Sequence, residues 1–569
     1  MNSQALTESN RKYDAHQIAR YYNLRPWLGW GRAIAIFGNF AWFILGLKLD
    51  EWRGVSERNK LRRAVHLRKM LVALGPTFIK VGQALSTRPD LIRKDFLDEL
   101  IKLQDQLPPF DNALALRQIQ SELGHPIKEM FSELTSAPVA AASLGQVYRG
   151  RLLTGEEVAV KVQRPNLRPI LSLDLYLMRW AAGWLAPWLP LNLGHDLTLI
   201  VDEFGTKLFE EIDYLNEGRN AERFATNFRN DPNVKVPAIY WRYTSTHVLT
   251  LEWLNGFKLT DTKRIIAAGL DPQAIIEIAV TSGLQQLLEH GFFHADPHPG
   301  NLFAMPDGRM GYIDFGMMDQ LDETTKETLV DAIVHLINKD YTDLAHDYVK
   351  LGFLTPDVDI RPIVPALESL LGDAINRNVG DFNFKTITDE FSKLMYDFPF
   401  RVPAKFALII RSLVTQEGIA LSLNPNFKIV EVAYPYVARR LLMGESPQLR
   451  RRLLNVLFKD GKFQWERLEN MIAIARTDNN FDLLPTAQMG LQYLLSDEGK
   501  FLQQQLVIAL TEDDRLHAQE VQRLWTLVKD DLNPSRLLGA AIGILTQFSR
   551  ERVAAILPAF TISNSVKNS

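Results

Sequence analysis

The chain has 569 residues, of which 46% are hydrophobic and 23% are charged, a balance typical of a folded protein with roughly two to four domains. Its 64 Lys and Arg residues nearly balance its 67 Asp and Glu residues, and the net charge is −3. The chain therefore lacks the overall basic field of many nucleic-acid-binding proteins, and we expect no nucleic-acid partner. The absence of cysteine excludes disulfides, thiolate metal sites, iron–sulfur clusters and cysteine nucleophiles.

The N-terminal residues are polar and lack the basic-then-apolar pattern of an export signal, which favours an intracellular location. An apolar segment at 27–47 follows, with Trp27, Trp30 and Trp42. Its uncharged part is shorter than the roughly 20 residues that a membrane-spanning helix needs. Two interpretations remain open: a helix packed inside the protein, or a helix lying in a membrane interface.

The next part of the chain changes from a helical to a strand pattern. Residues 61–123 are expected to form helices, with Pro76 opening one of them and Pro89 closing it. Residues 146–162 predict two strands joined by a turn at a Thr-Gly pair.

The remaining elements are predominantly helical. We expect a long helix at 208–224, strands at 240–253, and a mostly helical chain from 260 onward except for a short segment at 302–314. Two apolar runs near the C-terminus, 537–548 and 553–562, are each too short to span a membrane and are interpreted as packing helices, with membrane contact as the alternative.

This order of elements predicts an α+β protein with a two-lobed, protein-kinase-like fold and a helical extension at each end. The expected segments are an N-terminal segment at 1–60, a helical extension at 61–135, a small lobe at 136–255, a large lobe at 256–442 and a C-terminal helical region at 443–569.

The strongest functional pattern runs from His294 to Asn301 and is followed by Asp314-Phe-Gly. A kinase-type catalytic loop needs a carboxylate at the acceptor hydroxyl and, five residues later, an amide oxygen for a metal ion, and Asp296 and Asn301 have this spacing. Asp314 follows at a distance that permits a short hairpin back to the same cleft, where it would bind the metal. These three residues predict a magnesium–nucleotide site.

A lysine at the end of an apolar strand supplies the second element. Lys161, in Val-Ala-Val-Lys, is expected to contact the nucleotide phosphates, and a buried lysine of this kind needs a carboxylate partner. Candidates lie downstream at Glu211, Asp213 and Glu217. Glu217 is the first choice and Glu211 the second.

An alanine-rich segment stands where protein kinases carry a glycine-rich loop. Each Cβ restricts the backbone and keeps it away from the phosphates, so the nucleotide is expected to sit in an unusual pose. The residues predicted to contact the nucleotide, besides Lys161, are Ala140, Ala141, Ala142, Ser143, Gly145, Glu252 and Leu254.

The alanine-rich segment and the His-x-Asp-x-His-Pro-Gly-Asn loop, together with Lys80-Val-Gly-Gln83, resemble the UbiB/ADCK (aarF-domain) family of atypical kinases over about 61–442. The resemblance implies that the helix with Lys80 and Gln83 lies over the substrate side of the cleft and regulates it, and that Glu211 and Asp213 help to hold it. Lys80 and Gln83 are one helical turn apart, and Gly82 permits close backbone approach.

Two departures from ordinary protein kinases support this interpretation. No arginine separates His294 from Asp296, and His298 stands where a catalytic-loop lysine is common. After Gly316 the chain enters a predicted helix almost directly, without an activation segment. A peptide-docking surface is therefore not expected.

The resemblance implies an ATPase or kinase that binds ATP or ADP with Mg²⁺ and supports isoprenoid-quinone or related prenyl-lipid metabolism at a membrane. The alternatives are a protein kinase acting in trans and a nucleotide-gated scaffold with little turnover. The implied partners are a membrane or prenyl lipid and lipid-biosynthesis proteins. The Trp-rich start is similar to the branch of photosynthetic bacteria and plastids, so we expect peripheral association with a thylakoid or cytoplasmic membrane.

Overall fold

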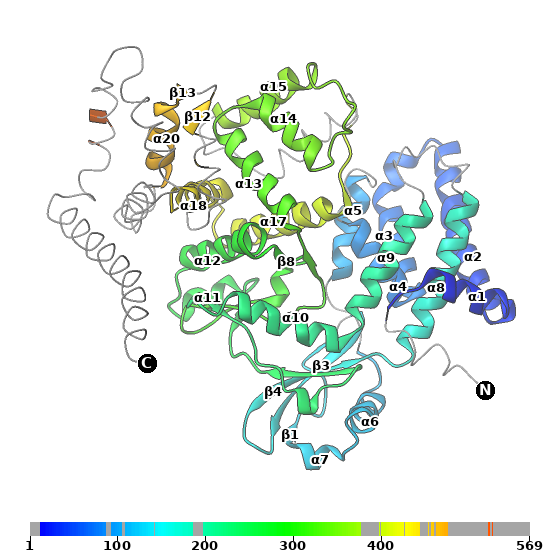
Figure 1. Ribbon diagram of the computed structural model, residues 1–569. Coiled ribbons are helices and arrows are strands. Elements are labelled where there is room, and N and C mark those ends of the chain that lie inside the picture. The colour runs from blue at the N-terminus through cyan, green and yellow to red at the C-terminus, as the bar shows by residue number, and fades with distance from the viewer. Residues whose placement is uncertain are drawn as a thin grey trace, which may run out of the picture. The chain divides into compact units, whose positions relative to one another are not determined.

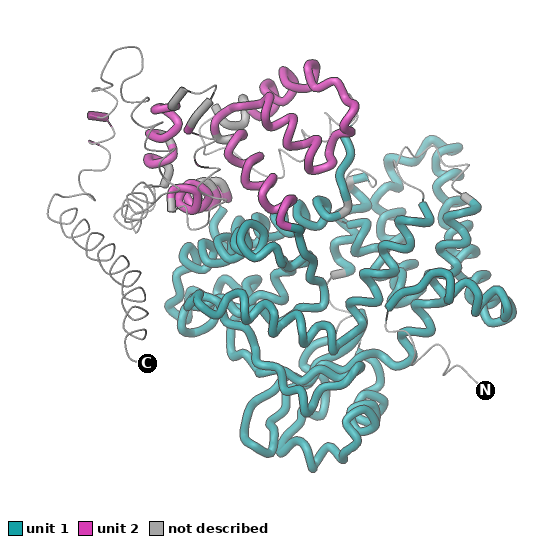
Figure 2. The backbone as a smooth tube through the Cα atoms, viewed as in Figure 1, with its two compact units in different colours: residues 1–322, 392–427 teal, residues 323–391, 428–569 magenta. Residues whose placement is uncertain are grey.

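The structure is a computed structural model of the full chain. It describes residues 12–86, 93–104, 109–141, 143–185, 197–376, 398, 400–425, 427–443, 453, 457–459, 462–475, 522–523 and 526. The chain divides into two compact units, the first made of 1–322 and 392–427 and the second of 323–391 and 428–569 (Figures 1 and 2). The five segments expected from the sequence stay a prediction.

The first unit begins with a group of helices. Their bounds are α1 (Ala15–Asn23), the 3-10 helix η2 (Pro26–Leu28), α2 (Trp30–Trp52), α3 (Ser56–Leu74), α4 (Pro76–Leu85), α5 (Lys94–Leu100), η3 (Ile101–Gln104), α8 (Leu167–Leu185) and α9 (Leu197–Glu211). Pro76 is the first residue of α4, as predicted, because a proline at this position loses no intrahelical hydrogen bond. Pro89 lies outside the described residues. Helix α8 was not predicted from the sequence.

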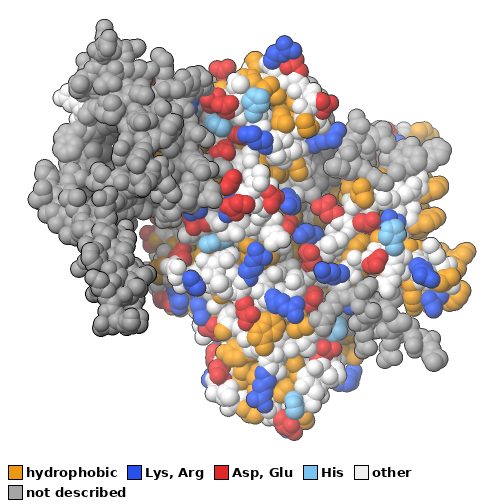
Figure 3. Space-filling model, viewed as in Figure 1, with side chains coloured by type: hydrophobic (Ala, Val, Ile, Leu, Met, Phe, Trp, Pro, Cys, Tyr) orange, Lys and Arg blue, Asp and Glu red, His pale blue; other side chains and the backbone are white. Residues whose placement is uncertain are grey.

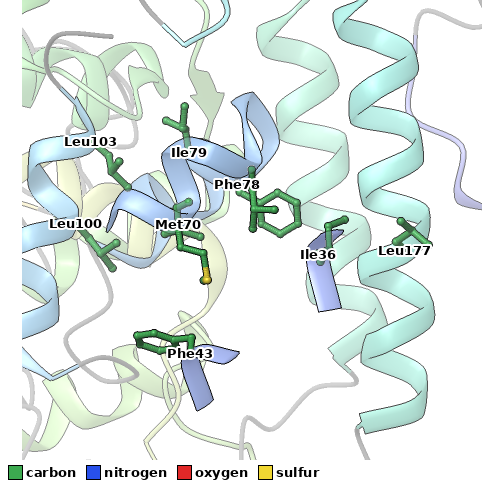
Figure 4. Close-up of a cluster of buried hydrophobic side chains, with 10 residues drawn as sticks. Ile36, Phe43, Met70, Phe78, Ile79, Leu100, Leu103 and Leu177 are labelled. Carbon is green, nitrogen blue, oxygen red and sulfur yellow. The ribbon is translucent and has the colours of Figure 1, made fainter. Parts of the chain in front are cut away.

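One buried cluster joins α2, α3, α4, α5, η3 and α8. Ile36 and Phe43 of α2 point toward Met70 of α3 and Phe78 of α4, with Leu177 of α8 beside them (Figure 4). All five side chains are at most 7% exposed. The inner face of α2 is thus packed into the protein, whereas its outer face carries the side chains considered below.

An antiparallel sheet forms the small lobe. Its strands are β1 (Phe131–Leu134), β2 (Ala140–Ala141), β3 (Gly145–Leu152), β4 (Glu157–Gln163) and β6 (Val248–Glu252). The order is β1-β3-β4-β6, and β2 pairs with the start of β3. The predicted hairpin at 146–162 is confirmed as β3 and β4. Helices α6 (Asn112–Leu123) and α7 (Ile127–Met130) complete this part, and Ala115 and Ile119 of α6 pack on the buried side of the sheet.

Two sequence predictions in this region are wrong in detail. The single helix expected at 208–224 is divided into α9 and α10 (Tyr214–Asn227), because the Asp213 carboxylate caps α10 by accepting hydrogen bonds from the backbone N–H groups of Leu215 and Asn216. Of the strands expected at 240–253, only β6 forms as a full strand. Residues Trp241–Tyr243 form the 3-10 turn η5.

The rest of the first unit carries the short strands and helices that follow the sheet. Its elements are β5 (Val234–Lys235), β7 (Phe257–Lys258), α11 (Thr262–Ala267), α12 (Pro272–Gln285), the π-helical turn η6 (Gln286–His290), β8 (Phe292–His294), η7 (Pro299–Asn301), β9 (Leu302–Ala304), β10 (Met310–Tyr312), β11 (Met318–Gln320) and α17 (Ala404–Leu423). Strands β9 and β10 pair as a hairpin, which accounts for the non-helical segment predicted at 302–314.

The second unit is mainly helical. Its elements are α13 (Glu323–Ile337), α14 (Tyr341–Lys350), α15 (Ile363–Asn376), α18 (Ile429–Met443), β12 (Phe458–Lys459), β13 (Lys462–Phe463) and α20 (Trp465–Ala475). The apolar runs predicted at 537–548 and 553–562 lie outside the described residues. An α+β core with helical regions on both sides of it in the chain agrees with the predicted fold class.

Candidate functional site

A cavity of about 160 Å³ in the first unit collects most of the residues that the sequence singled out. Its lining residues are Lys80, Gln83, Ala141, Ser143, Leu144, Gly145, Lys161, Glu211, Tyr214, His294, Asp296, His298, Asn301, Asp314 and Met317. They come from the helical extension, the small-lobe sheet and the loops around β8 and β9. Segments far apart in the sequence therefore meet at one place.

Lys161 reaches this cavity from β4. In the sheet it lies opposite Val147 of β3 and Leu249 of β6, so its backbone is fixed on both sides. Its Nζ lies 2.7 Å and 2.9 Å from the two carboxylate oxygens of Glu217 on α10, and 3.8 Å from Oδ1 of Asp314. Glu217 is thus the partner of Lys161, in agreement with the first choice from the sequence.

Burial and neighbouring charges together set the pKa values of Lys161, Glu217 and Asp314. Burial by itself would lower the pKa of Lys161, but the carboxylates of Asp314 and Glu217 outweigh it, and the net pKa is raised. Burial would raise the pKa of Asp314, yet Lys161 and the backbone N–H of Gly316 lower it to about 2. Burial raises the pKa of Glu217 to about 7 against the opposing effect of Lys161. Lys161 and Asp314 are accordingly both charged at neutral pH.

Helix α10 also holds the segment that carries Asp314. The side-chain amide of Asn220 donates to the carbonyl oxygen of Phe315 at 3.0 Å, and the rings of Phe224 and Phe315 lie 5.4 Å apart. The same helix presents Glu217 to Lys161. One helix therefore positions both the partner of the lysine and the second predicted metal ligand.

The loop between β8 and β9 carries Asp296 and Asn301. Nδ1 of the buried His294 accepts a hydrogen bond from the backbone N–H of Asp296, and Asn301 Nδ2 lies 3.4 Å from Oδ2 of Asp314. Nδ1 of His298 accepts from the backbone N–H of Gly300. The spacing that the sequence suggested thus brings Asp296, Asn301 and Asp314 to one cavity.

Arg411 of α17 is a site residue that the sequence analysis missed. Its guanidinium donates to the carbonyl oxygen of Ala295 from Nε at 3.0 Å and from Nη2 at 2.8 Å, and Nη2 lies 3.9 Å from Oδ2 of Asp296. The side chain is 8% exposed. It places a positive charge beside the catalytic-loop carboxylate, although no arginine lies between His294 and Asp296. No local pattern marks it.

Tyr214 is the second missed residue. Tyr214 lines the cavity, and its buried hydroxyl has no hydrogen-bond partner within the described residues. A Cβ at Gly145 would lie 2.5 Å from this hydroxyl and 2.5 Å from the carbonyl oxygen of Val162, so glycine is required there. The position of Tyr214 directly after Glu-Ile-Asp was the available sequence signal.

The alanine-rich segment forms β2 and the turn into β3. Ala141, Ser143 and Gly145 line the cavity, Ala140 pairs with Val147 without lining it, and Ala142 lies outside the described residues.

Two residues predicted to contact the nucleotide lie elsewhere. Glu252 is not among the cavity-lining residues; its carboxylate pairs with Lys235 at 2.7 Å and accepts from the backbone N–H of Ala238. Leu254 is buried close to Gly311 and is also not among them. The cavity therefore contains only part of the set of residues predicted to contact the nucleotide.

Helix α4 brings Lys80 and Gln83 to the cavity. Lys80 forms an ion pair with Glu211 at the end of α9, and the Gln83 amide donates to the carbonyl oxygen of Leu103 at 2.8 Å. A Cβ at Gly82 would overlap the Leu103 side chain, so glycine allows the close packing that the sequence suggested. Asp213, expected beside Lys80, instead caps α10.

Comparison with known proteins decides the family. The model of the ABC1 atypical kinase-like domain matches residues 102–348, and that of the UbiB helical domain matches residues 367–428. An uncharacterized protein of Synechocystis sp. is 67% identical over 98% of this chain and 98% of its own length. The chain belongs to the UbiB/ABC1 (aarF-domain) family of atypical kinases.

Other ABC1 relatives come from plants. The chloroplastic protein ACTIVITY OF BC1 COMPLEX KINASE 1 of Arabidopsis thaliana is 48% identical over 83% of this chain and 71% of its own length. A solved structure of a Mycobacterium tuberculosis protein in complex with erythromycin is 27% identical and covers 62% of this chain and 90% of that one, with a TM-score of 0.45. The family and its cyanobacterial and chloroplast relatives are those that the sequence motifs indicated.

The kinase-like domain of this ABC1 chain implies a nucleotide ligand, and the donors in the cavity fit its metal ion. No cluster of three or more His, Asp or Glu side chains suited to a metal occurs among the described residues. Mg²⁺ at phosphate sites typically takes only one or two protein ligands and completes its shell with phosphate oxygens and water. The ionised carboxylate of Asp314 and the amide of Asn301 provide such a pair, and the unpartnered Tyr214 hydroxyl is a free donor for a phosphate oxygen.

Proposed function

We propose that the chain binds a magnesium nucleotide in this cavity and hydrolyses it or transfers its terminal phosphate to a small acceptor. The observation that carries the proposal is the convergence of Lys161, Asp296 and Asp314 on one cavity. Lys161, held by Glu217, would neutralise phosphate oxygens. Asp296 would orient the attacking hydroxyl or water and accept its proton. The magnesium ion, held by Asp314 and Asn301, would screen the phosphate charges.

The size of the cavity favours water or a small acceptor over a protein substrate. Sites for complete small-molecule ligands usually occupy about 300–1,000 Å³, whereas this cavity measures about 160 Å³. Lys80 and Gln83 line it, and Glu211 fixes Lys80 by an ion pair. A nucleotide therefore requires the alanine-rich segment or α4 to move. A peptide would need α4 to leave altogether.

The outer face of α2 supports a membrane location. Among the described residues, the helices Trp30–Trp52 and Lys405–Leu423 are long and apolar enough to cross a membrane. The second helix carries Arg411 to the catalytic loop, so we assign it to the protein core. Helix α2 has 23 residues and is therefore longer than the uncharged run in its sequence. Its inner face, however, packs against α3, α4 and α8 and is not available to lipid.

We therefore place α2 in a membrane interface, lying along the surface rather than crossing it. Trp27, Trp30 and Trp42 are each at least 65% exposed, and hydrophobic side chains gather along the edge of the first unit where α1 and α2 lie (Figure 3). Tryptophan favours the boundary between lipid and water. The chloroplastic relatives and the family support a thylakoid or cytoplasmic membrane and a role in isoprenoid-quinone or other prenyl-lipid metabolism.

One experiment separates this function from its rivals. Phosphate release from ATP is measured with and without vesicles, beside transfer of labelled phosphate to a generic protein, for the wild-type chain and for Asp296→Asn. We expect slow release that vesicles alter and Asp296→Asn abolishes, with no protein labelling. Robust protein labelling would replace the proposal by a protein kinase, and tight nucleotide binding without release would replace it by a nucleotide-gated scaffold.

A further inference from the structure

A groove between α2 and α3 lies outside the nucleotide site. Its volume is about 420 Å³, and it is lined by Trp42, Leu45, Gly46, Leu49, Arg62, Arg63 and His66. The lining residues from α2 are all apolar, whereas those from α3 are two arginines and a histidine. This division by helix is the feature that a ligand must match.

The apolar side of the groove is open to solvent. Trp42 is 69% exposed, Leu45 49% and Leu49 39%. Other exposed apolar side chains of the first unit extend this surface along the neighbouring helices: Leu24, Trp27, Leu28, Trp30, Ile34, Phe37, Ile44, Trp52, Leu61, Trp180 and Trp184. Phe37 and Trp180 contact each other edge to face, with ring centroids 6.0 Å apart, so α8 joins the same surface. Apolar exposure on this scale marks an interaction surface.

The basic side retains a net positive charge. Arg63 is paired with Asp50 at 2.5 Å, and Asn59 donates to the same carboxylate, so Asp50 offsets one of the two arginines. Arg62 is exposed and has no ion pair within the described ranges. His66 is held against Phe43 with ring centroids 5.6 Å apart. A Cβ at Gly46 would overlap the Arg63 guanidinium, so glycine makes room for this group in the groove.

Two further acidic residues near the groove, Glu51 and Glu57, are each paired with a lysine. On α2, Glu51 pairs with Lys48 at 2.9 Å, and on α3, Glu57 pairs with Lys60 at 2.9 Å. Each pair is neutral as a unit. The Asp50 carboxylate interacts electrostatically with both Arg62 and Arg63, so the two guanidinium groups together keep one net positive charge for a phosphate group, next to an apolar wall.

We propose that this groove binds the phosphate headgroup of an anionic phospholipid in the membrane leaflet beneath α2. Guanidinium groups bind phosphate oxygens through paired hydrogen bonds, which suits Arg62 and Arg63. The first acyl carbons would lie against Leu45 and Leu49, and Trp42 would sit at the level of the headgroups. A soluble phosphate would use the basic side alone and leave the apolar wall exposed, so the two-sided lining favours a lipid.

This inference rests on the proposed location of α2 in a membrane interface, and it adds a specific headgroup site to it. The test uses the full chain and flotation with vesicles of phosphatidylcholine alone or mixed with phosphatidylglycerol. We expect the wild type to bind both vesicles and to prefer the mixed ones. Arg62→Gln should lower binding to the mixed vesicles about fivefold, since one basic residue near such a surface contributes about 1 kcal/mol, and leave binding to phosphatidylcholine unchanged.

Two further variants distinguish the groove from general surface charge. Arg58→Gln removes the same charge from an exposed position on α3, one turn from Arg62 and outside the groove. It should have a much smaller effect. Gly46→Ala leaves the charge unchanged but displaces the Arg63 guanidinium, and it should also reduce the preference for mixed vesicles. Circular dichroism checks that each variant folds.

The outcomes separate the two proposals. Binding to neither vesicle would overturn the interfacial location of α2 and the headgroup site with it. Equal wild-type binding to both vesicles would overturn the headgroup site alone. Equal losses in Arg62→Gln and Arg58→Gln would also overturn it, because the preference would then reflect charge without a site.

Discussion

The guanidinium of Arg411 donates two hydrogen bonds, of 3.0 and 2.8 Å, to the carbonyl oxygen of Ala295, the residue directly before Asp296. The two partners are 116 residues apart in the chain, and the arginine side chain is 8% exposed. A buried guanidinium that donates two hydrogen bonds to the backbone restricts the loop, and here it also places a positive charge 3.9 Å from the Asp296 carboxylate. Arg411 thus acts on the proposed chemistry through Asp296.

Arg411→Met should reduce turnover while leaving nucleotide binding nearly unchanged. Hydrogen bonds to charged groups contribute about 1.5–3 kcal/mol each, so we expect ATP hydrolysis to fall at least about tenfold. Steady-state phosphate release and a nucleotide titration measure the two effects separately. Lys405→Gln, an exposed exchange on the same helix, is the control. Equal losses of affinity and turnover would show that Arg411 supports the whole fold instead.

The residues of the proposed site differ in how far the sequence could reveal them. Asp296, Asn301 and Asp314 were recognisable because the loop at 294–301 and the β9–β10 hairpin that follows it, both short in sequence, bring them together. Lys161 was recognisable because an apolar strand fixes which way its side chain points. Arg411 was not, because its contact with the catalytic loop depends on how α17 packs against a distant segment.

The predicted boundaries of helices were wrong where side chains form hydrogen bonds with backbone groups that a continuous helix would use. The periodic pattern at 208–224 continues through Asp213, but this carboxylate accepts two backbone N–H groups and starts a new helix. The carbonyl oxygen of Ile212 is also taken by the side-chain amide of Gln163 at 2.7 Å. Gln163 lies far from Ile212 in the sequence, so the local pattern gives no sign of this hydrogen bond and predicts a single helix.

Asp314→Asn should remove most magnesium-dependent nucleotide affinity. The exchange removes the formal charge of a carboxylate whose pKa is lowered to about 2 and which lies 3.8 Å from Lys161. Titration of the chain with ATP, with and without Mg²⁺, should show at least a tenfold loss confined to the magnesium-containing series. Asp307→Asn, in the exposed turn of the β9–β10 hairpin, is the matched control. Unchanged affinity in Asp314→Asn would refute the assignment of this residue to the metal.

The stability of the catalytic loop should depend on pH through His294. Burial lowers the pKa of this side chain below its usual 6.5, while Asp314 and Asp296 oppose the shift. At pH values between this lowered pKa and about 6.5, His294 is protonated in the unfolded chain but neutral in the folded one. The contribution of neutral His294 to the free energy of unfolding is therefore fully present above about pH 6.5 and decreases as the pH falls below it.

Replacing His294 should remove this dependence. Denaturant unfolding at several pH values between 5 and 7 should show that His294→Gln loses a slope of up to about 1.4 kcal/mol per pH unit. His125→Gln, an exchange at an exposed position, should retain the wild-type slope. The same slope in all three proteins would mean that His294 does not titrate on unfolding.

The Lys80–Glu211 ion pair should restrain phosphate transfer. Its two side chains are 13% and 16% exposed and line the cavity, so the pair holds α4 beside the proposed acceptor position. Lys80→Ala should permit autophosphorylation, and Asp296→Asn added to it should abolish the transfer. Labelled-phosphate incorporation measures both. Lys102→Ala removes an exposed lysine that pairs with Glu99 and leaves Glu99 paired with Arg68, so this variant should not incorporate label. Labelling of the wild type at the level of Lys80→Ala would show that the pair does not restrain transfer.

Asp174 of α8 should determine how firmly α4 is held. Its fully buried carboxylate accepts from Arg32 Nε of α2 at 2.7 Å, from Arg32 Nη2 at 2.8 Å and from the Thr77 hydroxyl of α4 at 2.6 Å. Thr77 lies one turn before Lys80. A single carboxylate therefore links the helix proposed to lie on a membrane with the helix that lines the nucleotide cavity.

Asp174→Ala should lower the free energy of unfolding by about 3 kcal/mol, because it removes the carboxylate partner of Arg32 and the acceptor of the Thr77 hydroxyl and leaves a buried space. Arg32 is 25% exposed, so water compensates for part of the loss, and this places the effect at the lower end for a buried pair. Lys48→Gln breaks the exposed pair with Glu51 and should change stability by at most about 1 kcal/mol. Hydrogen exchange should show faster opening of α4 in Asp174→Ala than in Lys48→Gln. If α4 exchanges equally slowly in both, the Lys80 helix is held by its apolar contacts and not through Asp174.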